Sequence, residues 1–90
     1  MEITDIRIRR LTDDPKMRAI VSVTLDDELV IHDIKVISGY EKMFLAMPSR
    51  RLSNGSFSDI VHPTKKELRK KIEDAVLSEY ERYLNGDFEY

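Results

Sequence analysis

Residues 62–84, HPTKKELRKKIEDAVLSEYERYL, decide the fold, because this run carries the one helical repeat that the sequence shows. Its apolar side chains recur every three or four residues and form a single stripe, made of Leu68, Ile72, Ala75, Val76, Tyr80 and Tyr83. Thr64 is predicted to be the N-cap, and Glu67 completes a capping box three residues later. Asn85 and Gly86 are predicted to end the helix, since either residue can adopt the left-handed conformation of a C-cap.

The first two turns of this predicted helix are crowded with five cations, which are Lys65, Lys66, Arg69, Lys70 and Lys71. Most of the acidic residues come later, although the helix dipole favours the opposite order. Pairs four residues apart, such as Lys70 with Asp74, relieve part of the mutual repulsion. Because a helix N-terminus already presents free N–H groups to anions, the added cations predict a phosphate-binding site. A solvated charged face is the alternative interpretation.

Length and composition predict one small domain. A chain of 90 residues forms one domain, which we expect over residues 1–84, with residues 85–90 as a flexible tail. There is no cysteine, so neither a disulfide nor a thiolate metal site is expected. No run approaches the ~18 apolar residues of a membrane span. The N-terminus, MEITDIRIRR, is too charged for a signal peptide, so a cytoplasmic protein is expected.

The charge is distributed unevenly along the chain. Residues 48–72 hold seven basic and two acidic residues, a local charge of +5, so the remainder carries −7 of the net charge of −2. Such asymmetry favours an anionic partner on one side of the molecule.

Five strands are predicted ahead of the helix, at residues 3–11, 17–25, 29–37, 43–47 and 57–61. Clusters of turn residues separate them, and Asn54-Gly55 is the strongest tight-turn signal, at the end of a polar loop that begins at Ser49. In the second strand, Ser22 is expected on the outward face. The sequence thus predicts an α+β fold, an antiparallel sheet of about five strands with one C-terminal helix packed on one face.

The third predicted strand is apolar on parts of both faces. Strict alternation assigns Val30, Ile34, Val36 and His32 to one face, and Leu29, Ile31, Ile37, Asp33 and Lys35 to the other. A central position in the sheet, or a face covered by a second chain, would explain this pattern.

Four runs stand in a distinctive order, MRAIVSVTLDDELVIHDIKVISG at 17–39, MFLAMPSRR at 43–51, FSDIVHP at 57–63 and DAVLSEY at 74–80. In that order and spacing the chain resembles the SpoVG family of bacterial septation proteins, also called stage V sporulation protein G. The resemblance covers nearly the whole chain. It implies a cytoplasmic homodimer built through the sheet that binds DNA and also RNA, with roles in gene regulation, asymmetric septation and sporulation.

The resemblance also implies a nucleic-acid site at the helix start. The matching positions are Lys65, Lys66, Arg69, Lys70 and Lys71, with Arg50 and Arg51 as helpers. Arg50 and Arg51 could contact phosphate or a guanine edge. A solvated hairpin, or a pair to Asp59, is the alternative for both.

Other candidate sites are weaker. Tyr40, Phe44 and Phe57 could stack on unpaired bases, but aromatics on short strands are usually core residues, which is the interpretation we favour. His32 with Asp33, and His62 with Asp59, would point to opposite faces of regular strands, and two histidines make a weak metal signal. His62 is expected to pack or cap before Pro63. We therefore expect no catalytic residues, no metal and no cofactor, and hence no enzyme.

Two functions remain open from the sequence. The first is a dimeric regulator that clamps the phosphate backbone of DNA, and also of RNA, with two helix starts. The second is a protein-interaction module that acts on the division or transcription machinery with only incidental nucleic-acid binding. Neither requires a membrane or a small-molecule substrate.

Overall fold

The chain forms strands first and a long helix last, and a computed structural model describes residues 1–86. In these residues the elements are β1 (Ile3–Leu11), β2 (Met17–Leu25), β3 (Leu29–Ser38), β4 (Met43–Ala46), β5 (Ser49–Arg51), β6 (Phe57–Asp59) and α1 (Lys66–Leu84). Asn85 and Gly86 close the helix. Of the predicted flexible tail, residues 87–90 lie outside the described part of the chain.

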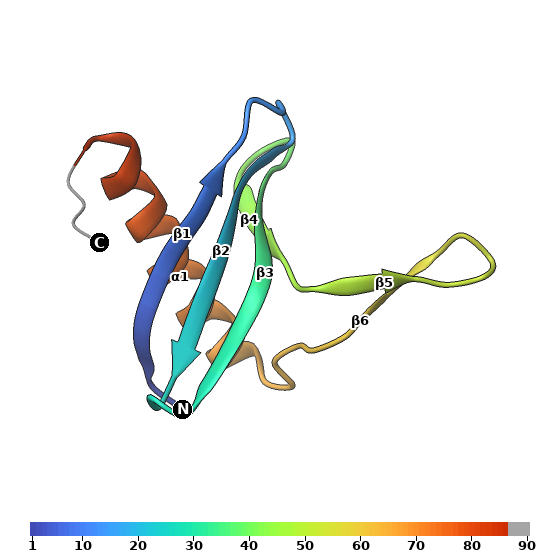
Figure 1. The fold of residues 1–90 in the computed structure, drawn as a ribbon, viewed down its shortest axis with the longest axis horizontal. Helices are drawn as coiled ribbons and strands as arrows, with labels where there is room; N and C mark the ends of the chain where they lie inside the picture. Colours follow the sequence, from blue (N-terminus) through green and yellow to red (C-terminus); the bar gives the residue numbers. More distant parts are fainter. Residues whose placement is uncertain (87–90) are drawn as a thin grey trace.

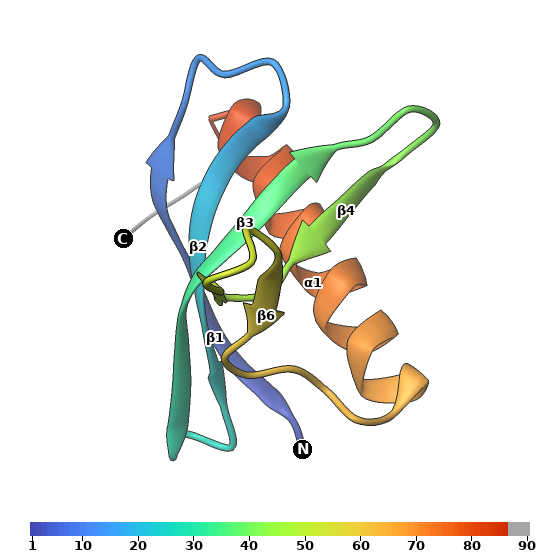
Figure 2. The same cartoon turned by 90° about the vertical axis from the view of Figure 1, so that its right-hand side faces the viewer.

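The elements make two separate sheets. Strands β1 to β4 form an antiparallel sheet in chain order, and α1 packs across one of its faces (Figure 1). Strands β5 and β6 form a two-stranded ribbon that projects from this body and points toward the viewer in Figure 2. We call residues 49–59 the arm. The α+β prediction is therefore confirmed. Strand β3 lies between β2 and β4, the central position that its two apolar faces indicated.

The prediction of about five strands in one sheet was wrong in its detail. Residues 57–59 pair with residues 49–51, which we expected to be loop, and residues 60 and 61 belong to no strand. The tight turn at Asn54-Gly55 explains the difference. It brings residues 49–51 and 57–59, which are close in the chain, into register at little entropic cost. Pro48, which has no N–H to donate, lies between β4 and β5 and separates the two sheets.

The core lies between the four-stranded sheet and α1. Alternate residues of β2 are buried, as predicted, and the helix contributes Ile72, Val76 and Tyr80 from the middle of its stripe. Leu68 and Tyr83 are partly buried at the two ends of that stripe. The period of 3.6 on the helix and of two on the strands therefore placed most of the core correctly.

A bulge in β3 overturns the predicted assignment of its faces. Val21 is opposite Ile34 and Val23 is opposite Ile31, so β3 has one more residue than β2 between these pairs. Asp33 accommodates the extra residue with a φ of 64°. Ile31 therefore faces the core together with Ile34, and Val30 is exposed instead of sharing their face.

The outer face of the sheet holds one buried polar residue. Ser22 is only 2% exposed, although we expected its outward face to be wet. Its hydroxyl lies 2.8 Å from Nδ1 of His32 and accepts a hydrogen bond of 3.1 Å from Nε of Arg9. These long side chains cover the serine, and the hydrogen bonds offset the cost of burying it.

The start of α1 differs from the prediction and its end agrees. The N-cap is Lys65 rather than Thr64, and no side chain caps the first turn, so the capping box is wrong. Thr64 stands one residue too early, because the Lys65 carbonyl already accepts the first helical bond from Arg69 N–H at 3.2 Å. At the other end Gly86 adopts a φ of 81°, which is the predicted left-handed C-cap.

The β1–β2 turn is ordered by one carboxylate. Oδ1 of Asp14 accepts backbone N–H bonds from Lys16 at 2.7 Å and from Met17 at 3.1 Å. These two bonds stabilise the charged form and hold the pKa of Asp14 below its ordinary value of 3.8.

Candidate nucleic-acid interface

The predicted phosphate site at the start of α1 contains cations of two kinds, with and without a carboxylate partner. Lys65 and Lys66 are exposed, and neither ammonium has an ion-pair partner within residues 1–86. They stand beside the free N–H groups of the first turn, which no side chain caps. Glu67 is the single acid in that turn and offsets part of the positive charge.

The other three cations of the helix start each contact a carboxylate. Arg69 pairs with Glu73 at 3.9 Å, and Lys70 pairs with Asp74 at 3.4 Å, which is the pair that the four-residue spacing predicted. The Lys71 ammonium lies 3.5 Å from Glu2 and donates to the Met1 carbonyl at 3.3 Å. Such exposed pairs are weak, typically below ~1 kcal/mol, so a polyanion can replace them at modest cost.

These cations also spread around the helix. A helix turns by ~100° per residue, so Lys66 and Lys70 lie within ~40° of each other on one side. Lys71 lies ~100° beyond Lys70, on the side where the N-terminal residues Met1 and Glu2 approach the helix. The helix start therefore offers Lys66 and Lys70 as neighbouring donors, with Lys71 turned away from them.

The arm presents the two other predicted residues. Arg50 and Arg51 lie next to each other on β5, so their side chains point to opposite faces of the ribbon. Both are exposed, and neither guanidinium has an ion-pair partner within the described residues. The alternative of a pair to Asp59 is not formed here, because Ser49 rather than either arginine stands opposite Asp59.

The tip of the arm is ordered by its own hydrogen bonds. The Leu52 N–H donates to Ser56 O at 2.8 Å, and the Gly55 N–H donates to Leu52 O at 3.0 Å. The Asn54 side-chain oxygen accepts from the Ser56 N–H at 3.0 Å and from its hydroxyl at 2.6 Å. Gly55 has a φ of 89°, a conformation that favours glycine, so the Asn54-Gly55 turn forms as predicted.

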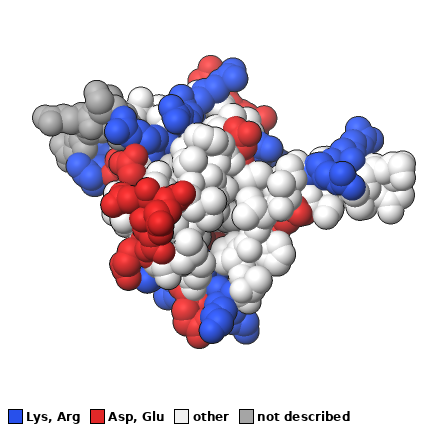
Figure 3. Space-filling model, turned by 60° about the horizontal axis from the view of Figure 1, so that its bottom comes forward, with Lys and Arg blue, Asp and Glu red and all other residues white. Residues whose placement is uncertain are grey.

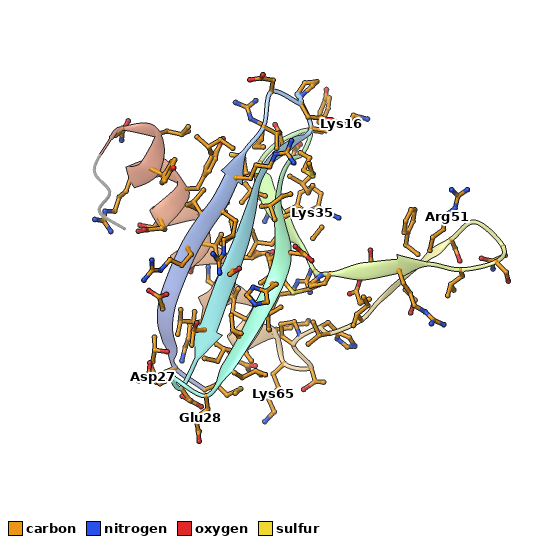
Figure 4. All side chains as sticks on the ribbon, viewed as in Figure 1. Lys16, Asp27, Glu28, Lys35, Arg51 and Lys65 are labelled. Atoms are coloured by element: carbon orange, nitrogen blue, oxygen red, sulfur yellow. The ribbon has the colours of Figure 1, made fainter. Side chains whose placement is uncertain are left out.

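The two basic regions are separate in space. In Figure 4 the Arg51 side chain points upward from the projecting arm, whereas Lys65 lies at the lower end of the body. Figure 3 shows basic side chains on the arm and at the lower margin, with mostly uncharged surface and some acidic atoms between them. Asp27 and Glu28 lie toward the same lower end as Lys65, so the potential there is mixed (Figure 4).

The aromatic residues contradict the core interpretation that we favoured. Tyr40 and Phe57 are largely exposed, and Phe44 is partly exposed. For Phe57, the Asn54-Gly55 turn could have indicated exposure, because it predicts a hairpin. A two-stranded ribbon with short strands has no second layer against which to bury a side chain.

Neither histidine is paired with its acidic neighbour in the described residues, since His32 meets Ser22 and His62 meets the Pro63 backbone. His62 is exposed, and its Nδ1 lies 3.1 Å from the Pro63 carbonyl oxygen. No group of three or more potential metal ligands occurs within residues 1–86. No helix in that range is both long enough and apolar enough to cross a bilayer.

Comparison with known proteins gives one consistent result. The family model SpoVG matches residues 1–82. A relative from Clostridium acetobutylicum is 55% identical over 87 residues, covering 97% of this chain and 92% of its own length. A relative from Bacillus licheniformis is 55% identical over 89 residues, 99% of this chain and 90% of its own. One from Desulforudis audaxviator is 57% identical over 88 residues, 98% of this chain and 100% of its own. All three carry the name "Putative septation protein SpoVG".

Proposed function

The chain belongs to the SpoVG family, and from this premise we propose that it is a dimeric, cytoplasmic regulator that binds DNA and also RNA. It would act by occupancy, holding the phosphate backbone and blocking or recruiting other factors. Through this binding it would affect gene expression, septation and sporulation. The proposal assigns it no catalytic activity, metal or cofactor.

One observation carries the proposal. Four exposed cations, Lys65, Lys66, Arg50 and Arg51, have no carboxylate partner within residues 1–86, whereas Arg69, Lys70 and Lys71 do. A fold with more acidic than basic residues could have paired them, since it has 17 acids for 15 bases. Phosphates supply the missing partners, and contacts to phosphate position a protein on any sequence.

The dimer is proposed to form through the sheet. Strands β1 and β4 are the two edges of the four-stranded sheet, and β4 is only four residues long. An edge strand leaves backbone N–H and C=O groups available for pairing with a second copy. A chain of this length buries only about 60–65% of its surface alone, so a partner would add core.

A salt titration tests the phosphate contacts. Fluorescence anisotropy would follow a labelled duplex across a salt series centred on about 0.15 M. Changing Lys65→Ala together with Lys66→Ala is expected to lower affinity on every sequence. It should also reduce the log–log salt slope by about 0.9 for each phosphate that the protein no longer neutralises.

The control is Lys16→Ala, which removes a cation from the opposite end of the body (Figure 4). It should leave both affinity and slope near the values of the native chain. If the double variant and the control behave alike, the helix start does not contact phosphate. If the native chain binds neither duplex nor single strand at that salt, the proposed function itself fails.

A protein-interaction role remains the second candidate. A groove beside β4 and α1 mixes apolar and charged side chains, including Met43, Leu77, Lys42 and Glu81. Mixed surfaces of this kind suit a protein partner better than a polyanion. Loss of nucleic-acid binding at physiological salt would favour this candidate over the first.

A further inference from the structure

The arm carries an aromatic ring that no packing contact in the core explains. Phe57 begins β6 and is 70% exposed, whereas Ile72 in the body is 1% exposed. Leaving a ring in water forgoes the apolar burial that would otherwise stabilise the fold. A large exposed aromatic on an ordered ribbon therefore points to a ligand.

The neighbour of this ring identifies the kind of ligand. Arg51 stands directly opposite Phe57 in the β5–β6 ladder. Directly opposed residues of an antiparallel pair share one face, with their Cβ atoms about 4.5–5.5 Å apart. The Arg51 side chain rises from the arm and away from the body (Figure 4). One face of the ribbon thus presents a flat apolar ring and a cation side by side.

We propose that Phe57 and Arg51 together bind one unpaired base and its phosphate, so that the arm selects single-stranded RNA or DNA over a duplex. The ring stacks on the face of the base, and the guanidinium contacts the adjacent phosphate. In a duplex both faces of each base are already covered by neighbouring pairs, so the ring has nothing to stack on. This inference rests on the proposed nucleic-acid binding and names its substrate class.

Whatever covers this face must satisfy both groups. A surface that covers Phe57 also covers Arg51, and burying a guanidinium without an anionic partner is costly. A nucleotide satisfies both groups at once, since it offers a π-face and an anion within a few ångströms of each other. The hydrogen-bonded tip holds the ribbon in place before binding, which lowers the entropic cost of association.

Affinities for single strands and duplexes test the proposal. The probes are an oligo(U) and an oligo(dT) of about 12 nucleotides, and a duplex of the same length. Phe57→Ala and Phe57→Leu are expected to weaken single-strand binding about 5- to 150-fold, the range that one stacked base accounts for. Duplex affinity should change less than twofold. Phe57→Tyr, which keeps an aromatic ring, should bind single strands about as tightly as the native chain. Tyr40→Ala, which removes another exposed aromatic, is the matched control and should have no effect.

A fluorescence probe reports stacking itself. The chain has no tryptophan, so Phe57→Trp introduces a single indole. Oligo(dT) is expected to quench this indole, because a stacked base does so, and the duplex is expected to leave it unchanged. The matched reporter Tyr40→Trp should not respond to either probe. Circular dichroism of each variant checks that the fold is intact.

Several results would overturn the proposal. Single-strand affinity within twofold of the native value in both Phe57→Ala and Phe57→Leu would show that the ring does not stack. An equal loss on duplex and single strand would assign Phe57 to duplex binding. A change of molar mass in sedimentation for either variant would assign it to contacts between copies. Failure of the native chain to bind any of the three probes would remove the proposed function and this inference together, whereas the first three results leave the proposed function in place.

Discussion

The body and the arm differ in how far they bury their side chains. In the body, the sheet and α1 enclose Val21, Ile34 and Val76 completely. In the arm, strands of three residues expose both their arginines and Phe57. Packing explains the residue types in the body. It does not explain those in the arm, so their chemistry points to a partner outside the described residues.

A related contrast separates paired from unpaired cations. Arg69, Lys70 and Lys71 find carboxylates on α1 or near the N-terminus. Arg50 and Arg51 lie on a ribbon whose only acid, Asp59, is at its base. Like the two unpaired lysines at the helix start, these arginines have no carboxylate partner within residues 1–86, so a phosphate need not displace one.

The largest expected effect is a loss of folding stability from a substitution in the body, compared with a substitution in the arm. Ile72→Ala should lower the free energy of unfolding by about 2–5 kcal/mol, because it opens a cavity under the sheet. Phe57→Ala should change it by less than about 0.5 kcal/mol, since the ring is mostly in water. Urea denaturation followed by circular dichroism measures both, and equal losses would mean that the arm is part of the stabilising core.

Next in size is removal of the charge on the arm. Arg50→Gln with Arg51→Gln should reduce the salt slope of duplex binding by about 0.9 for each phosphate that the arm no longer neutralises. The lysine pair of substitutions, Arg50→Lys with Arg51→Lys, keeps the charge and should preserve most of the slope. Anisotropy titrations at several salt concentrations give the slopes. An unaltered slope in the glutamine variant would remove the arm from the interface.

A smaller effect compares a paired with an unpaired cation on the same side of α1. Lys66→Ala should weaken binding more than Lys70→Ala does, because Lys70 must first separate from Asp74. Conversely, Asp74→Asn should strengthen nucleic-acid binding by freeing Lys70. It should reduce the stability of the fold by only about 0.2–0.5 kcal/mol. Binding that is weakened by Asp74→Asn would contradict this account.

The smallest effect lies at the β1–β2 turn, far from both basic regions. The folded state lowers the pKa of Asp14 below 3.8, so its charged form stabilises the fold above that pH. This contribution is lost as the pH falls through the lowered folded pKa. The stability advantage of the native chain over Asp14→Asn should therefore be constant near neutral pH and shrink below about pH 4. Thermal melts across pH 2–7 would show this, and an advantage that grows on acidification would refute the assigned cause.

Local patterns in the sequence predicted the elements well and their surroundings less well. Strands β1 and β2 and the end of α1 appear where alternation, spacing and Gly86 indicated. The faces of β3 were misassigned, because a single left-handed residue, Asp33, shifts the alternation and nothing in the sequence marks it strongly. The N-cap was misplaced by one residue, because threonine is a favoured N-cap residue and lysine is not.

The candidate site shows the same division. Its seven cations could be selected from sequence because charge runs and a family resemblance are both local properties. The local pair of Lys70 with Asp74 could also be predicted, from its four-residue spacing. The contact of Lys71 with Glu2 could not, because it forms only through the packing of α1 beside β1. Phe57 was taken for a core residue because its exposure depends on whether β6 joins the main sheet or pairs with β5.

By itself, the sequence determined the α+β class, the four strands of the main sheet and the helix in order, the apolar stripe of α1 and the concentration of positive charge between residues 48 and 72. These follow from backbone periodicity, turn chemistry and charge, which act between residues close together in the chain. Only the tertiary structure decided that the last two strands leave the body as an arm. It also decided that Lys71 meets Glu2 and that the ring of Phe57 stays in water. Those properties depend on distances between segments that are remote in sequence, and such distances are set by packing of the whole chain.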